Sequence, residues 1–104
     1  MDTSLDAEFV AKSESIITQL GFKNLKSFVK NQALPILLAK IEKFEVENKH
    51  FEGKYGLGFC GFQERIERKE NQEDFTEEDD YLDWRFAKEA LERLKRQTRE
   101  LEYA

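Results

Sequence analysis

The chain has 104 residues, a single-domain length, with 39% hydrophobic residues, 38% charged residues and a net charge of −5. This apolar share is low and the charged share is high for a self-sufficient globule, which favours long amphipathic helices whose core a second subunit or a partner completes. A lone cysteine, Cys60, excludes an internal disulfide. No stretch approaches the roughly 20 apolar residues of a membrane span, and no basic-then-apolar leader opens the chain, so we expect a cytoplasmic protein without membrane contact.

The first predicted element is a helix over about residues 5–20. Thr3 and Ser4 are suitable N-cap residues, and Gly21 is a typical stop after the last turn. The apolar residues that share one face of this helix are Leu5, Phe9, Ile16, Ile17 and Leu20.

A long second helix is predicted from Asn24, which caps it, to about Phe51, because apolar residues keep a helical period throughout. Pro35 lies inside it, and a proline in a regular helix interior costs about 3 kcal/mol. The apolar phase is nevertheless the same on both sides of Pro35. We therefore expect a kinked helix, or two abutting helices, with the kink near residues 31–35.

Four glycines within residues 53–61 predict a turn, followed by a short helix that points Phe59, Phe62 and Ile66 inward. The glycine pattern lacks the Gly-Lys-Ser/Thr ending of a phosphate-binding loop. Residues 70–79 are acidic and predict a loop or linker. A last helix is predicted over about residues 77–101, with a heptad-like apolar seam of Trp84, Ala87, Leu91, Leu94, Thr98 and Leu101.

The predicted fold is therefore all-α: two N-terminal helices of which the second is long and Pro-kinked, a short helix after a Gly-rich turn, and a C-terminal amphipathic helix. Residues 1–69 form the expected core and dimerisation region. Residues 70–104 form an acidic linker and helix, within the same domain or as a partner-binding extension. The residues expected in the core or in a homodimer contact are Phe28, Ile36, Leu37, Ile41, Phe44, Trp84, Leu91 and Leu94.

No set of residues predicts catalysis, a metal or a cofactor. His50 is the single histidine and is expected on an exposed helix surface, since no Ser, Cys or Asp lies near it in an ordered motif. Cys60 is expected to be a small buried side chain, because no base that could form a thiolate is evident. The acidic run lacks the register of a calcium loop. We therefore expect a protein that is not an enzyme.

The charge pattern predicts a binding surface. Residues 1–50 carry seven acids and seven lysines, so the whole imbalance lies in residues 51–104, and residues 70–83 hold eight acids and no base. Acidic protein repels nucleic acid and suits a basic protein surface. Aromatic residues within this charged stretch are typical of interface anchors. The predicted partner contacts are Asp79, Asp80, Tyr81, Asp83 and Phe86, with Tyr81 and Phe86 pointing away from the apolar seam.

A weaker nucleic-acid pattern lies at the start of the second helix, where Lys23, Lys26 and Lys30 share one face. Three lysines could contact phosphates, although acids elsewhere oppose them. DNA binding by an autoregulator is therefore one alternative. A structural subunit that oligomerises through the seam of the last helix is another.

Three parts of the sequence resemble a known family. These are residues 20–29 (LGFKNLKSFV), residues 39–45 and 51–56 (AKIEKFE and FEGKYG) with Phe62, and the acidic run leading to residues 79–84 (DDYLDW). Together they resemble the small helical antitoxins of prokaryotic type II toxin–antitoxin pairs. The resemblance implies a protein that neutralises a cognate, basic toxin through its acidic C-terminal segment. Residues 1–4 are too short and polar for the strand that precedes the helices of ribbon–helix–helix antitoxins, so operator binding is not implied.

Overall fold

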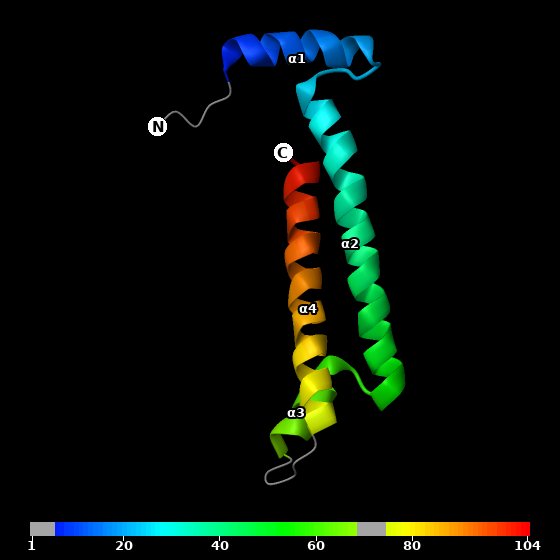
Figure 1. The fold of residues 1–104 in the computed structure, drawn as a ribbon. Coiled ribbons are helices and arrows are strands. Elements are labelled where there is room, and N and C mark those ends of the chain that lie inside the picture. Colours follow the sequence, from blue (N-terminus) through cyan, green and yellow to red (C-terminus); the bar gives the residue numbers. More distant parts are fainter. Residues whose placement is uncertain (1–5, 69–74) are drawn as a thin grey trace.

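The computed structural model describes residues 6–68 and 75–104, and within these ranges the chain forms four helices and no strand (Figure 1). The helices are α1 (Ala7–Gln19), α2 (Leu25–Tyr55), α3 (Phe59–Arg68) and α4 (Phe75–Glu102). The all-α prediction is confirmed. The molecule is elongated, measuring 64 × 33 × 20 Å along its principal axes, because α2 and α4 lie side by side as a long antiparallel hairpin.

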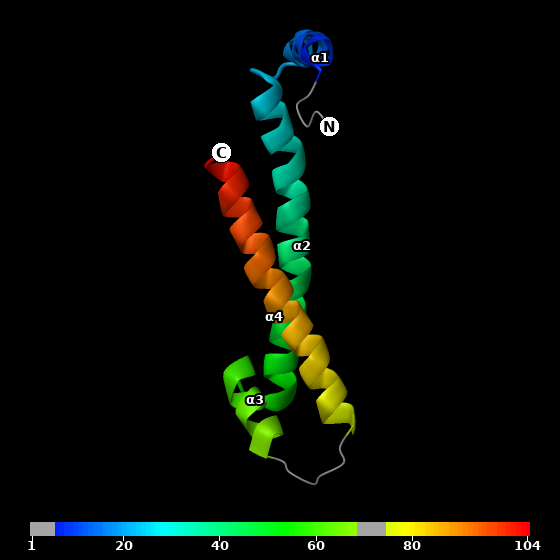
Figure 2. The ribbon, with the colours of Figure 1, turned by 90° about the vertical axis from the view of Figure 1, so that its left-hand side faces the viewer.

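Helix α1 lies roughly perpendicular to α2, across its N-terminal end (Figures 1 and 2). Asp6 caps it, since its Oδ1 accepts a hydrogen bond of 2.8 Å from the amide of Glu8. The predicted caps Thr3 and Ser4 lie outside the described residues. Gly21 follows the last turn with a φ of 100°, a left-handed conformation that glycine adopts without strain. The predicted stop at Gly21 is confirmed.

Helix α2 is a single helix of 31 residues that continues through Pro35. Asn24 caps it as predicted, with its side chain accepting a hydrogen bond of 2.8 Å from the amide of Ser27. The alternative of two abutting helices is therefore wrong. The helix also extends one turn beyond its predicted end at Phe51. It stops at Gly56, which adopts a left-handed φ of 67°.

The apolar seam of α4 packs along α2 of the same chain (Figure 2). The seam residues Trp84, Ala87, Leu91 and Leu94 are buried, and they recur at steps of three and four as in a coiled coil. On α2, Phe51 is buried as well, whereas Leu37, Ile41 and Phe44 are half-buried. The seam is thus filled within one chain, and an oligomer built through the same seam would require the hairpin to open.

The start of α4 corrects the predicted linker. Helix α4 begins at Phe75, so residues 75–79 are helical, while residues 69–74 lie outside the described part of the chain. Glu77 and Glu78 stand in the first turn, where negative charge is stabilised by the positive end of the helix dipole. The same acidic composition that predicts a loop therefore also favours a helix start.

Candidate functional site

An aromatic cluster fills the lower end of the hairpin, where α2, α3 and α4 meet in Figure 1. Trp84 and Phe62 at its centre are fully buried, with 5.4 Å between their ring centroids, and Phe51 stacks on Trp84 at 5.5 Å. Nε1 of Trp84 donates a hydrogen bond of 2.8 Å to the side-chain oxygen of Asn48. Aromatic pairs of this kind add about 0.5–1.5 kcal/mol beyond their buried area. The lower end is therefore the best-packed part of the molecule.

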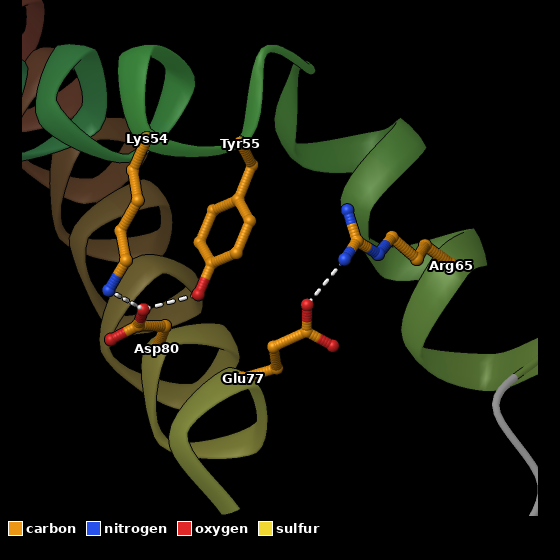
Figure 3. A network of polar contacts seen from close by, with 5 residues as sticks. All are labelled: Lys54, Tyr55, Arg65, Glu77 and Asp80. Carbon is orange, nitrogen blue, oxygen red and sulfur yellow. Dashed lines mark hydrogen bonds and ion pairs between the residues drawn. The ribbon is translucent and has the colours of Figure 1, made fainter. Parts of the chain in front are cut away.

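Polar side chains on the first turns of α4 form hydrogen bonds and ion pairs with side chains of α2 and α3 (Figure 3). The carboxylate of Asp80 accepts hydrogen bonds from Nζ of Lys54, at 2.5 Å, and from the hydroxyl of Tyr55, both on the last turn of α2. The guanidinium of Arg65 on α3 pairs with the buried Glu77 at 2.5 Å. These contacts hold the first turns of α4 in position beside both α2 and α3.

The charge of Asp80 is stabilised by its surroundings. Burial by itself raises the pKa of Asp80, but the hydrogen bonds from Lys54 and Tyr55, together with the electrostatic effects of Lys54 and His50, lower this pKa by a larger amount. The pKa of Asp80 therefore lies below its ordinary value of 3.8. The carboxylate is held in its charged form as a structural contact between two helices.

The structure divides the five predicted partner-binding residues into two groups. Asp80 is engaged by α2, and Tyr81 stacks on Phe59 at 5.7 Å while its hydroxyl accepts a hydrogen bond from Gln63. Tyr81 thus packs against the aromatic cluster, and the prediction that it points away from the core is wrong. The remaining three residues, Asp79, Asp83 and Phe86, are exposed.

Phe86 belongs to a cleft between α2 and α4. Its ring meets the ring of Phe44 edge-on at 5.9 Å, while 60% of the Phe86 side chain remains exposed. The cleft has a volume of about 560 Å³ and is lined by Lys43, Phe44, Val46, Glu47, His50, Phe51, Asp83 and Phe86. A second cleft continues it toward the upper end of the hairpin and shares Lys43 and Phe44 with it. We call the side of the hairpin that carries both clefts the open face.

Two acids and one lysine, Lys43, line the lower cleft of the open face, whereas the charged residues that line the upper cleft are all basic. Glu47 and Asp83 line the lower cleft, and Asp79 lies one helical turn before Asp83 on the same side of α4. Lys40 and Arg93 line the upper cleft. The sequence pattern indicated the acids on α4, but the contribution of α2 follows only from the pairing of the two helices.

The residues predicted for the core or for a dimer contact differ in how deeply the single chain buries them. Trp84, Leu91 and Leu94 are buried in the single chain, and Phe28 is half-buried with its ring 5.1 Å from that of Phe22. Leu37, Ile41 and Phe44 are half-buried beside α4, whereas Ile36 remains 60% exposed.

Of the three predicted phosphate-contacting lysines, Lys23 and Lys26 are exposed. Lys30 instead donates hydrogen bonds of 3.0 Å to the main-chain oxygens of Glu102 and Ala104 at the end of α4. This contact joins the upper ends of α2 and α4 and leaves two of the three lysines fully available to a ligand.

The residues considered for catalysis are both exposed. His50 lies on the surface of α2, as predicted, whereas the prediction of a buried Cys60 is wrong, since its side chain is exposed at the start of α3. In residues 6–68 and 75–104, no three His, Cys, Asp or Glu side chains are grouped in a way that could hold a metal ion. No helix in these ranges has the length and apolar character needed to cross a membrane.

Comparison with known proteins gives no match to this chain among family models, curated proteins or solved structures.

Proposed function

We propose that the chain is a non-enzymatic protein-binding module of the antitoxin kind, which binds a basic partner protein through the lower end of its open face. The observation that carries this proposal is the exposed Phe86 beside Phe44, in a cleft whose edges bear Glu47 and Asp83. An aromatic anchor within a charged edge is the arrangement found at the energetic centre of many protein interfaces.

A cleft of this form suits an amphipathic helix or strand that carries lysine or arginine. The apolar side of such a segment would cover Phe44 and Phe86, and its basic residues would reach Glu47, Asp79 and Asp83 at the edge. Complementary charges of this kind raise the association rate and orient the partner. Because the cleft lies beside the well-packed aromatic cluster, little backbone freedom is lost on binding, which favours affinity.

The two rival functions receive less support. The lysines proposed for a DNA-binding autoregulator include Lys30, which is bound to the end of α4. The seam proposed for a structural oligomer is filled by α2 in the same chain.

Co-expression with the product of the adjacent gene, followed by calorimetric titration of the purified proteins, tests the proposal. Replacing Phe86 by Ala removes the anchor, and we expect affinity to fall about 30-fold, as for an interface hot spot of about 2 kcal/mol. The charge reversals Asp79→Lys and Asp83→Lys together should weaken binding about tenfold and reduce its dependence on salt.

A matched control changes the net charge equally on another side of the molecule. Glu64 lies on α3 and Glu92 lines the cleft between α3 and α4, so the double variant Glu64→Lys, Glu92→Lys should bind as the wild type does. Equal losses in the two double variants would show a nonspecific charge effect and overturn the proposed site. Absence of any complex with the adjacent gene product would overturn the antitoxin assignment.

A further inference from the structure

The two clefts of the open face differ in the sign of their charge. Lys40, Lys43 and Arg93 are the charged side chains that line the upper cleft, which has a volume of about 410 Å³. Glu47 and Asp83 line the lower cleft, and Lys43 lines both clefts where they adjoin. A segment that lies along the open face from its lower end therefore meets carboxylates first and cations after them.

These five charged side chains have no ionic partner in the described part of the chain. Within residues 6–68 and 75–104, no salt bridge involves any of them, whereas Lys54 is paired with Asp80 and Lys95 with Glu45. All five side chains are exposed. They are therefore available to a ligand, and complementary charges on a ligand determine its orientation and its specificity.

Apolar side chains line both clefts between these charges. Phe44 belongs to both clefts, Leu37 and Leu94 line the upper one, and Phe86 is 60% exposed in the lower one. Two helices that lie side by side form a groove, into which a third helix can pack its apolar side at an interaxial distance of about 9 Å. An amphipathic helix is therefore the segment that this groove accommodates.

We propose that the partner segment that binds the open face is an amphipathic helix with basic residues at one end and acidic residues at the other. Its bases pair with Glu47 and Asp83, its apolar residues cover Phe86, and its acids pair with Lys40 and Arg93. This inference rests on the proposed function, because both use the anchor Phe86, and it adds the acidic end of the partner segment.

The positions of the charges on α2 and α4 determine the spacing expected in the partner helix. On α4, Arg93 follows Asp83 by ten residues, which is about 15 Å at 1.5 Å per residue. On α2, Lys40 precedes Glu47 by seven residues, or about 10 Å. The bases and acids that the partner helix presents to the open face should therefore lie about seven to ten residues apart, which is two to three helical turns.

Partners of uniform charge match only one of the two clefts. A wholly basic segment that extends beyond the lower cleft contacts Lys40 and Arg93 with like charges. A single-stranded nucleic acid bound to these bases contacts Glu47 and Asp83 with its phosphates where it continues along the groove. Like charges in contact across an interface are destabilising. A helix of mixed charge is the partner that meets complementary charges in both clefts.

Three synthetic helical peptides, of equal length and with identical apolar residues, test the inference on the full chain. The first has bases and acids at the spacing given above, the second is wholly basic and the third is wholly acidic. Fluorescence anisotropy at physiological salt measures their affinities. We expect the mixed-charge peptide to bind about tenfold more tightly than either other peptide, since each exposed charge pair contributes only a few-fold. Nonspecific attraction to a chain of net charge −5 would instead favour the wholly basic peptide.

The double variant Lys40→Glu, Arg93→Glu replaces two bases of the upper cleft by acids. It should bind the wholly basic peptide more tightly than the mixed-charge peptide, which reverses the order expected for the wild type. The matched control is Lys49→Glu, Arg99→Glu, since Lys49 and Arg99 are exposed on the same two helices and line neither cleft. The control changes the net charge equally and should keep the wild-type order. Circular dichroism establishes that both variants remain helical.

Equal binding of the mixed-charge and wholly basic peptides overturns the inference, as does the same reversal of order in both double variants. Tightest binding of the wholly acidic peptide, or of an oligothymidylate, shows a site for polyanions and also overturns it. Failure of all three peptides to bind at millimolar concentration has the same meaning.

The complex with the adjacent gene product distinguishes this inference from the proposed function. If Phe86→Ala weakens that complex and Lys40→Glu, Arg93→Glu does not, the proposed function stands and this inference fails. If no such complex forms and the mixed-charge peptide still binds in the expected order, the antitoxin assignment fails and the chemistry inferred for the open face stands.

Discussion

Replacing Asp80 by Asn should destabilise the protein at neutral pH and leave its stability nearly unchanged in acid. The carboxylate accepts hydrogen bonds from Tyr55 and Lys54. A hydrogen bond to a charged group contributes about 1.5–3 kcal/mol and a neutral one about 0.5–1.5, so neutralising the acceptor costs roughly 1–2 kcal/mol at the Tyr55 contact. The Lys54 pair adds at most about 1 kcal/mol, because the lysine side chain is 42% exposed and screened by solvent.

The expected loss is therefore about 2 kcal/mol at pH 7, which lowers the Tm by about 8–16 °C in a domain of this size. The pKa of Asp80 is lower in the folded chain than its ordinary value of 3.8. The contribution of the Asp80 carboxylate to the free energy of unfolding is thus complete at a pH above the pKa of this group in the unfolded chain. It disappears as the pH falls through the lower pKa of the folded chain. Below both values the wild type and the variant should unfold at the same temperature.

Thermal unfolding followed by far-ultraviolet circular dichroism, repeated from neutral pH into the acid range, measures this difference. Asp79→Asn is the matched control, since Asp79 is the preceding residue and is exposed. It should change the Tm by no more than a degree or two at any pH. A loss for Asp80→Asn that persists unchanged in acid, or a loss equal to that of the control, would refute the assignment of Asp80 as a charged structural contact.

Other perturbations have equally definite outcomes. Trp84→Ala should cost about 3–5 kcal/mol, a large part of the roughly 5–15 kcal/mol that holds a domain folded, and the near-ultraviolet circular dichroism signal should collapse. Gly56→Ala places a side chain at a φ of 67° and should cost about 1–2 kcal/mol in urea unfolding, whereas Gly58→Ala, outside that region, should cost less than half as much. Cys60 is exposed, so a thiol reagent should label it in the native protein at a rate that denaturant raises only slightly; slow labelling that requires unfolding would contradict its position at the start of α3.

The helices could be predicted largely because their signals are local. Asn24 is a side chain that caps a helix, Gly21 permits a left-handed backbone, and the seam of α4 repeats at steps of three and four. The start of α4 was harder to predict, because acidic residues favour both a solvated linker and the first turn of a helix. The choice between them depends on contacts with distant residues, such as that between Arg65 and Glu77.

The candidate site could be predicted only in part. The acids on α4 and the aromatic Phe86 are visible in the sequence, and the structure leaves Phe86 exposed. Tyr81 has the same signature, yet it packs on Phe59 because α3 folds back beside it. The partner of Phe86 within the cleft, Phe44, lies far away in sequence. No periodicity within one helix reveals which residues of another helix will face it.

The aromatic cluster gives the hairpin a gradient of local stability along its length. Opening the lower end requires exposing Trp84 and Phe62, which are fully buried, whereas α1 is held through the single buried side chain of Ile17. Local unfolding free energies follow such differences in buried contact, so amide hydrogens of α1 should exchange first and those around Trp84 last. The free energy of local opening should therefore rise along the molecule from α1 toward the end of the hairpin that carries α3.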